Sequence, residues 1–422
     1  MRLGMSEAAV KRFIGLTSNS RRERVKRRRH KPNRPLATAM SAGMTLTSAA
    51  PDGRADALLT SFERAGYARV MPAILQPAEP FLDLSGEDIR KRMYLTTDPQ
   101  GRELCLRPDL TIPVSRDYLA SPAAGAPQAF CYLGPVFRHR AEGAGEFLQA
   151  GIESFGRADK AAADAEMLAL GLEATSHYGL DAPDIRMGDV ALFSALIAAL
   201  DLAPAWKRRL IKDFNHKTSL LQDLDRLAIS ASHARPEYQG VLAALAGSDP
   251  KAAHALVTDL LSIAGITAVG GRSVGEIADR FLEQSALGAQ TSLPRETRAL
   301  IEKFLAIGGD PDEAAADLRA FAREAKIALD APLDLFESRT GFLAARGVDV
   351  GRIRFSTAFG RGLDYYTGFV FELYDPSAPA AGQLVAGGRY DGLLTRLGSA
   401  SAISAVGFAV WIERLAQLRG TP

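Results

Sequence analysis

Strand-like segments lie toward both ends of this chain, and a long helix-like run separates them. Before the run, residues 129–138 and 146–155 are apolar and flank a polar loop that contains glycine, a pattern typical of paired antiparallel strands. After it, residues 352–356 and 369–374 again read as strands. Residues 191–346 alternate leucine- and alanine-rich amphipathic segments with Gly and Pro breakers, without a strong strand signal. The chain therefore predicts an α+β fold, in which an antiparallel sheet flanked by helices receives an α-helical insertion.

The changes between strand-like and helix-like sequence patterns set the predicted domain limits. Residues 48–190 and 347–422 form the predicted core, and residues 191–346 form the helical insertion. Residues 1–47 form a basic leader of a different composition.

The leader carries a charge opposite to that of the rest of the chain. Residues 1–35 hold twelve Lys or Arg against two acids, a net charge of +10, and the remaining residues have a net charge of −8. Such a run repels itself, so we expect it to be disordered. Either it is a tail that could bind nucleic acid nonspecifically, or translation starts later, at Met40 or Met44.

Composition and residue spacing exclude several classes of protein. With 47% hydrophobic and 24% charged residues, the chain is typical of soluble globular proteins. No apolar run approaches the roughly 20 residues needed to cross a bilayer, and no secretion signal is present, so we expect a cytoplasmic protein without a membrane partner. Cys105 and Cys131 lie in apolar, strand-like segments and are predicted to be buried free thiols. The cysteines and six scattered histidines lack metal-ligand spacing, so neither a metal nor a cofactor is predicted.

Residues 361–368 place an arginine, an aspartate and two tyrosines directly ahead of the apolar strand 369–374. If this octapeptide shares the extended backbone of the strand, Asp364 and Tyr366 point to one face and Tyr365 points to the other. Such a stretch could line a polar pocket, or it could be an ordinary hairpin strand that happens to contain tyrosines. The octapeptide by itself leaves both interpretations open.

Several motifs, in this order and at this spacing, together resemble the catalytic core of class II histidyl-tRNA synthetases. The resemblance runs from about Pro51 to Leu418. Residues 106–111 read Leu-Arg-Pro-Asp-Leu-Thr, similar to that family's Leu-Arg-Pro-Glu-x-Thr. The other matching segments are residues 137–153 for motif 2, 361–368 and 387–393 for the two histidine-binding signatures, and 407–415 for motif 3. The combination of Arg-Gly-Leu-Asp-Tyr-Tyr with Gly-Gly-Arg-Tyr-Asp-Gly is the most specific part of the resemblance.

The resemblance implies a histidine pocket, which needs acceptors for an ammonium, a cation for a carboxylate and polar partners for an imidazole. The predicted histidine-binding residues are Asp109, Thr111, Gln149, Glu153, Arg361, Tyr365, Tyr366 and Tyr390. By resemblance the first three receive the ammonium, Arg361 faces the carboxylate, and Glu153, Tyr366 and Tyr390 surround the ring. Asp109 stands where the family has glutamate and is one methylene shorter. The alternative is that these polar groups only satisfy one another inside an inherited fold.

The nucleotide side departs from the synthetase pattern. Where the family has Phe-Arg-x-Glu, this chain has Phe-Arg-His-Arg, so Arg140 replaces the glutamate, and the following loop is short and lacks further arginines. Trp411 stands where the family tends to have glycine, either in the space of an adenine or as part of the core. Arg138, Arg140 and Arg414 are therefore interpreted as a vestigial nucleotide side, and we expect aminoacyl-adenylate chemistry to be lost.

Only seven residues follow Leu415, so no anticodon-binding domain is expected, and tRNA is not a predicted partner. With these departures, the chain resembles the family of ATP phosphoribosyltransferase regulatory subunits. The resemblance implies a non-catalytic subunit that the short catalytic subunit requires for activity and that takes part in feedback inhibition by histidine. It also implies a class II-like dimer within a hetero-octamer. The alternatives are a truncated ligase that activates histidine or another amino acid with ATP, and a nucleic-acid-binding module that uses residues 21–34.

Overall fold

The structure, a computed structural model, describes most of the chain. The described residues are 53–85, 89–141, 143–214, 220, 222, 224–225, 250–263, 268–269, 272–273, 275 and 295–418. The basic leader and much of the predicted insertion lie outside these residues.

The chain divides into two compact units, which we describe separately. One unit comprises residues 51–233 and 290–422, and the other comprises residues 1–50 and 234–289. The described part of the second unit is helix α11 (Pro250–Ile263) and the strand pair β8 (Ala268–Val269) and β9 (Arg272–Ser273). The predicted domain limits at residues 191 and 346 stay a prediction.

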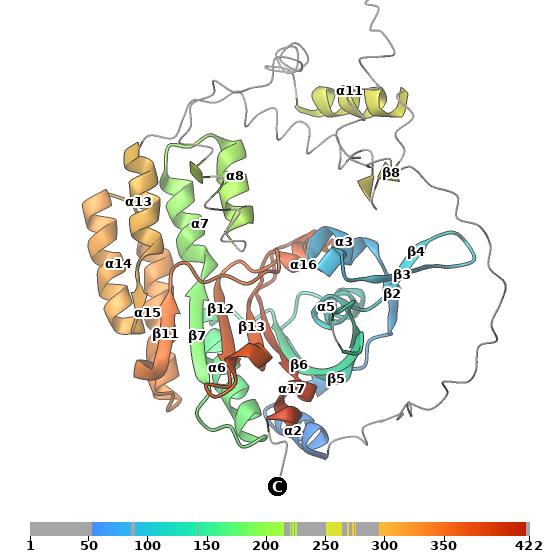
Figure 1. The fold of residues 1–422 in the computed structure, drawn as a ribbon, viewed down its shortest axis with the longest axis horizontal. Helices are drawn as coiled ribbons and strands as arrows, with labels where there is room; N and C mark the ends of the chain where they lie inside the picture. The colour runs from blue at the N-terminus through green and yellow to red at the C-terminus, as the bar shows by residue number, and fades with distance from the viewer. Residues whose placement is uncertain are drawn as a thin grey trace, which may run out of the picture. The chain divides into compact units, whose positions relative to one another are not determined.

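A mixed sheet of nine strands forms the centre of the first unit (Figure 1), in the order β1-β5-β6-β14-β13-β12-β7-β11-β10. Only the pairs β1–β5 and β7–β11 are parallel, and the rest are antiparallel. In sheet order the strands are Ala68–Arg69, Gln128–Phe137, Glu146–Phe155, Ala405–Trp411, Val385–Arg389, Phe369–Tyr374, Asp184–Asp189, Ile353–Ser356 and Gly308–Gly309. Strands from before and after residues 191–346 are therefore neighbours in one sheet, and the predicted α+β fold is confirmed.

Helices surround this sheet, and α6 (Lys160–Ser176) packs against β12, β13 and β14. Helix α15 (Asp330–Ala345) packs in turn on α6. The others are α2 (Gly53–Arg64), α3 (Glu79–Leu84), α5 (Thr111–Ala120), α7 (Val190–Ala199), α8 (Pro204–Asp213), α13 (Arg295–Leu305), α14 (Pro311–Ala325), α16 (Leu393–Arg396) and α17 (Ile412–Gln417). No helix in the described ranges is long and apolar enough to cross a membrane.

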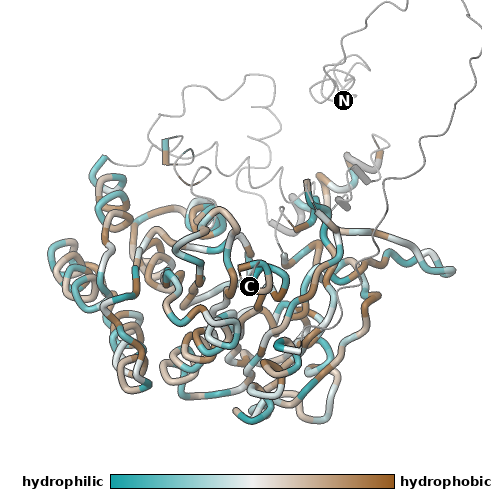
Figure 2. Tube along the Cα trace, turned by 60° about the horizontal axis from the view of Figure 1, so that its bottom comes forward, coloured by the Kyte–Doolittle hydropathy of each residue, from teal (hydrophilic) through white to brown (hydrophobic). Residues whose placement is uncertain are grey.

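A second, three-stranded sheet lies beside α3 and α5, with the order β2-β4-β3. Its strands are β2 (Leu75–Pro77), β3 (Tyr94–Thr97) and β4 (Glu103–Leu106). Colouring by hydropathy shows apolar stretches alternating with polar ones along the helices (Figure 2), as expected for helices with one buried face. Cys105 and Cys131 are buried free cysteines in β4 and β5, as predicted.

Two local expectations were wrong. The octapeptide 361–368 is not extended, because β12 begins only at Phe369 and the preceding residues form turns and a bend. Tyr365 and Tyr366 are consequently buried together, with ring centroids 4.9 Å apart, instead of pointing to opposite faces. Within residues 191–346, where the sequence has no strong strand signal, the described strands β8, β9 and β10 have two residues each, too few to produce an alternating pattern.

Candidate functional site

A cavity lies on one face of the large sheet, and a row of paired residues explains why it is there. Side chains directly opposite each other in antiparallel strands share a face. The row that crosses β5, β6, β14, β13 and β12 consists of Tyr132, Gly151, Ala409, Ala386 and Glu372. Large side chains stand at its two ends and small ones in the middle, which leaves a hollow of about 150 Å³. A cavity of about 150 Å³ is known to hold a six-membered aromatic ring.

Most of the predicted histidine-binding residues line this cavity. They come from the start of α5, from β6, from the turn ahead of β12 and from the end of β13, and all are buried. The predicted residues in the wall are Asp109, Thr111, Gln149, Arg361, Tyr365, Tyr366 and Tyr390. Segments far apart in the sequence thus meet at one polar hollow.

Glu153, the eighth predicted residue, does not line the cavity but lies immediately behind its wall. Its carboxylate accepts hydrogen bonds from the hydroxyls of Thr111 (2.7 Å), Tyr132 (3.0 Å) and Tyr390. Gly407, opposite Glu153 on β14, makes room for this group, since a Cβ there would overlap the carboxylate. Glu153 is therefore held by three hydroxyls, two of which belong to residues in the cavity wall.

Burial dominates the protonation of the acids at this site. Loss of hydration raises the pKa of Glu153 to about 7, although the hydroxyls of Tyr390, Thr111 and Tyr132 oppose the shift. Burial also raises the pKa of Asp109, whose carboxylate accepts a hydrogen bond from the amide of Ile112 at 3.1 Å. Both acids therefore hold protons more tightly than exposed carboxylates do.

Three tyrosine rings form a flat-sided wall of the cavity. The ring of Tyr390 meets Tyr365 and Tyr366 nearly edge-on, at centroid distances of 5.7 and 6.4 Å and interplanar angles of 72° and 73°. Such edge-to-face contacts stabilise aromatic clusters beyond the burial of their area. The wall offers aromatic faces and hydroxyl groups to a planar, polar ring.

Sequence reasoning missed Glu372, which also lines the cavity and forms an ion pair with Arg361. Its Oε1 accepts a hydrogen bond from Nε of Arg361 at 3.0 Å, and its Oε2 accepts one from the hydroxyl of Tyr374 at 2.6 Å. Nη1 of Arg361 donates to the hydroxyl of Tyr366. A charged residue in the middle of the apolar strand 369–374 was the signal that could have revealed it.

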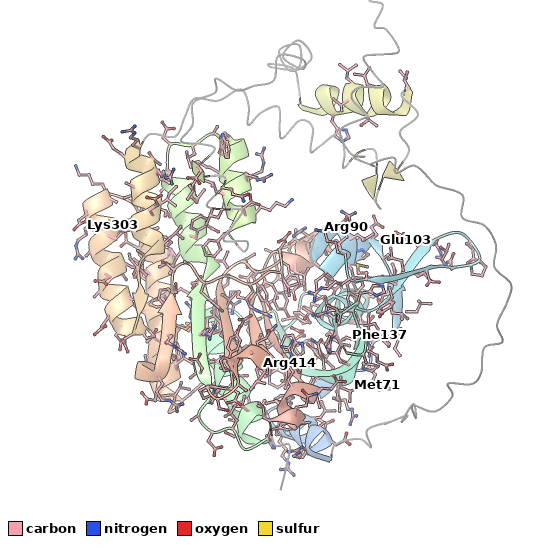
Figure 3. The ribbon with its side chains drawn as sticks, in the orientation of Figure 1. Met71, Arg90, Glu103, Phe137, Lys303 and Arg414 are labelled. Carbon is pink, nitrogen blue, oxygen red and sulfur yellow. The ribbon has the colours of Figure 1, made fainter. Side chains whose placement is uncertain are left out.

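The three arginines of the predicted nucleotide side make different contacts. Arg138 lines the cavity, donates from Nε to the carbonyl of Pro108 at 2.6 Å, and has its pKa lowered to about 10 by burial. The guanidinium of Arg140 lies 3.6 Å from the ring centroid of Phe147. Arg414, labelled in Figure 3, donates to the carbonyl of Gln383 at 2.6 Å. Neither Arg140 nor Arg414 is part of the cavity wall.

Trp411 closes the cavity next to Gln149, with which it pairs across β14 and β6. Its side chain is buried, and the guanidinium carbon of Arg414 lies 5.3 Å from the ring. The indole is thus a core residue that also forms part of the cavity wall, and its position in the space of an adenine stays a prediction.

A buried charge cluster lies on the opposite face of the sheet, beneath α6. Arg339 of α15 donates to Asp164 of α6 at 3.1 Å and to Asp189 at the end of β7. Arg389 of β13 donates from Nε to the other oxygen of Asp164 at 2.8 Å. All four side chains are almost completely inaccessible to water. The Gly-Gly-Arg-Tyr motif is therefore divided: Tyr390 lines the cavity, and Arg389 connects the sheet to the helices.

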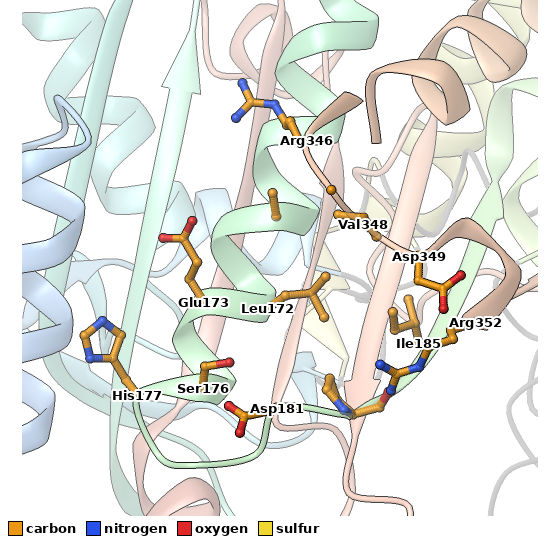
Figure 4. A pocket seen from close by; sticks show the side chains of 13 residues that line it. Leu172, Glu173, Ser176, His177, Asp181, Ile185, Arg346, Val348, Asp349 and Arg352 are labelled. Atoms are coloured by element: carbon orange, nitrogen blue, oxygen red, sulfur yellow. The ribbon is translucent and has the colours of Figure 1, made fainter. Parts of the chain in front are cut away.

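A larger hollow of about 610 Å³ lies at the C-terminal ends of α6 and α15, away from the predicted residues. Its charged residues, which include Glu173, Asp181 and Arg352, are exposed (Figure 4). Within the described ranges, no group of three or more His, Cys, Asp or Glu side chains could hold a metal ion. The cavity with its buried polar groups is the better candidate for a functional site.

Comparison with known proteins relates the chain to one group of sequences and folds. The family model described as histidyl-tRNA synthetase matches residues 50–270 and 256–415. Proteins named ATP phosphoribosyltransferase regulatory subunit from Brucella canis and Brucella suis are each 44% identical to the chain over 351 residues, which cover 82% of this chain and 92% of theirs.

Solved structures of related proteins have the same fold. An ATP phosphoribosyltransferase regulatory subunit/histidyl-tRNA synthetase from Bacillus halodurans has a TM-score of 0.60 at 21% identity, covering 87% of this chain and 79% of its own. A histidine–tRNA ligase subunit from Alicyclobacillus acidocaldarius has a TM-score of 0.51 at 25% identity, covering 93% of this chain and 100% of its own.

Proposed function

The chain belongs to the family of ATP phosphoribosyltransferase regulatory subunits, which has the fold of histidyl-tRNA synthetases, and we propose that it is the non-catalytic subunit through which histidine controls that enzyme. In this proposal the short-form catalytic subunit requires the chain for activity in the first step of histidine biosynthesis. The observation that carries the histidine part of the proposal is the buried cavity with its acids, arginine and tyrosine wall.

The cavity has a complementary group for each part of a histidine molecule. Asp109, Thr111 and Gln149 supply oxygen acceptors for the ammonium. Arg361 supplies the cation for the carboxylate, and the tyrosines supply flat walls and hydroxyls for the imidazole. Glu153 reaches the ligand only through the hydroxyls that it holds, unless one of these side chains rotates. A volume of about 150 Å³ suits one small amino acid.

Inhibition follows from linkage between this cavity and the catalytic subunits. If histidine binds a less active arrangement of the complex more tightly than an active one, it shifts the population toward the inactive arrangement. A tenfold change in activity needs only about 1.4 kcal/mol of differential binding. A histidine-selective cavity is therefore sufficient for regulation without any chemistry of its own.

The positions of the arginines support a non-catalytic role. Arg140, which stands where the synthetase motif has glutamate, packs its guanidinium on Phe147, and Arg414 donates to the carbonyl of Gln383, so the acid of motif 2 is replaced by a cation. The rival proposal is a ligase that still activates histidine with ATP. Histidine-dependent pyrophosphate exchange by the purified chain, at the rate of an ordinary synthetase, would favour this rival.

For the assembly, we propose a class II-like dimer of this chain within a hetero-octamer that also contains the catalytic subunit, located in the cytoplasm. A tRNA is not a proposed partner, because residues 36–422 have a net charge of −8 and would repel a polyanion.

The decisive experiment is co-purification with a short ATP phosphoribosyltransferase, followed by assay with and without the chain and with and without histidine. We expect activity only in the complex, and inhibition by histidine. Activity of the catalytic subunit that is the same with and without the chain would contradict the proposal.

The variant Arg361→Ala tests the cavity as the regulatory site. Removing the cation should weaken histidine binding at least about tenfold, measured by calorimetry, and should raise the histidine concentration needed for inhibition, while the complex still assembles. Arg102→Ala, on the exposed turn between β3 and β4, is the matched control and should bind histidine normally. Unchanged inhibition in Arg361→Ala would mean that the regulatory site lies elsewhere, for example at a subunit interface.

A further inference from the structure

Glu372 is the charged residue of β12, and its position is unusual for a strand in the middle of a sheet. Its neighbours on the same row are Ala386 of β13 and Arg186 of β7. Its side chain is only 14% exposed and lines the cavity. A carboxylate so nearly buried normally needs charged or hydrogen-bonding partners, and both of its oxygens have one.

These contacts fix the plane of the Arg361 guanidinium. Glu372 holds Nε, the Tyr366 hydroxyl holds Nη1, and none of the hydrogen bonds found within the described residues uses Nη2. Because the guanidinium is planar and rigid, two fixed nitrogens also determine the direction of the third. The edge that carries Nη2 is therefore the one left for another acceptor.

Glu372 is itself held from the side away from Arg361. The hydroxyl of Tyr374 donates to Oε2 at 2.6 Å, and the guanidinium of Arg186 lies over the Tyr374 ring at 4.1 Å. Arg186 pairs in turn with Asp184 at 3.2 Å. The hydrogen bond from Tyr374 thus orients the carboxylate of Glu372, and that carboxylate in turn orients the guanidinium of Arg361.

We propose that Glu372 is a positioning residue that aims Arg361 at the carboxylate of an α-amino acid, and that it thereby makes the cavity selective for ligands that carry this carboxylate. The proposal rests on the proposed function, since it concerns the same cavity. Glu372 acts through Arg361 and not through contact with the imidazole.

A comparison of the affinities for histidine and histidinol distinguishes this positioning role from a general effect of the substitution on the fold. The two molecules share the imidazole and the ammonium, but histidinol has a hydroxymethyl group in place of the carboxylate. Calorimetry with the full chain would compare both ligands on wild type, Glu372→Ala and Glu372→Gln. The alanine variant should bind histidine about tenfold more weakly and histidinol almost normally, because only histidine uses the aimed guanidinium. Glutamine keeps an oxygen acceptor for Nε and should restore most of the affinity for histidine.

Equal losses for the two ligands in Glu372→Ala, or a glutamine variant as weak as the alanine variant, would overturn the proposal. If the alanine variant does not fold, Tyr374→Phe carries the test. It removes the bond to Oε2 and should weaken histidine binding roughly threefold without affecting histidinol, and unchanged histidine binding would overturn the proposal. A wild-type chain that does not bind histidine would instead contradict the proposed function, before any variant is compared.

Discussion

Glu153 lies completely out of water, and its three hydroxyl donors do not fully compensate for the lost hydration. Its pKa in the folded chain is about 7, compared with an ordinary value of 4.5. In the folded protein the acid therefore keeps its proton across a range where the unfolded chain has released it. Between these two values the folded state binds more protons, so this residue makes the protein less stable as the pH rises.

We predict that Glu153→Gln reduces this pH dependence, because glutamine has a similar shape and does not titrate. Below pH 4.5 Glu153 is protonated in both the folded and the unfolded chain and does not change the free energy of unfolding. Above pH 7 it is ionised in both states, and its burial lowers the free energy of unfolding by about 3 kcal/mol. Urea denaturation measures the free energy of unfolding at pH 5 and at pH 8. Between these two pH values the wild type should lose roughly 2 kcal/mol more stability than the variant. Glu146→Gln, at the exposed start of the same strand, is the control and should follow the wild type. Parallel pH profiles for wild type and Glu153→Gln would contradict the prediction.

At the scale of elements, the buried charge cluster joins parts of the chain that hydrophobic contact alone would leave free to shift. Asp164, Arg339 and Arg389 connect α6, α15 and β13, and Asp189 also caps α7 by accepting from the amide of Ala191 at 2.9 Å. Buried ion pairs contribute little net stability, but removal of one partner leaves an uncompensated charge. The cluster therefore specifies how these elements pack.

Replacing Arg339 with methionine should destabilise the protein by about 3–5 kcal/mol, because Asp164 and Asp189 lose their common cation in a dry environment. Arg319 of α14 is a matched control, since it also contacts several acids, Asp334 and Glu337 among them, but these are exposed. Arg319→Met should cost less than about 1 kcal/mol. Urea denaturation measures both values, and equal losses would mean that the buried cluster behaves like a surface network.

At the scale of the whole molecule, the leader and the rest of the chain, which contains the cavity, have net charges of opposite sign. Residues 1–35 have a net charge of +10 and lie outside the described residues, and all residues of the cavity wall fall between 89 and 411. We therefore predict that regulation through the cavity, as proposed above, does not require the leader.

Deletion of residues 1–39 should accordingly leave the chain able to complement a histidine auxotroph that lacks the regulatory subunit. Growth without histidine, compared with the full chain and with Arg361→Ala as a variant altered in the cavity, measures the effect. Loss of complementation by a deletion variant that is still expressed would favour the nucleic-acid-binding alternative for the leader.

The α+β fold and seven of the residues that line the cavity could be predicted from the sequence, for a physical reason. Strand periodicity and helical amphipathicity reflect contacts between near neighbours, and these patterns indicated the α+β fold. Asp109, Thr111, Gln149, Arg361, Tyr365, Tyr366 and Tyr390 were predicted because they belong to short motifs, and all seven line one cavity.

Tertiary structure alone decided what depends on strand register and on burial. Only the register aligns Glu372 with Ala386, so that the acid faces the cavity and meets Arg361. The register of β14 against β6 sets Gly407 opposite Glu153, which leaves room for that acid behind the cavity wall. Burial at this position raises the pKa of Glu153. A sequence specifies which side chains are available along the chain, but cross-strand neighbours and the loss of water exist only once the distant segments have come together.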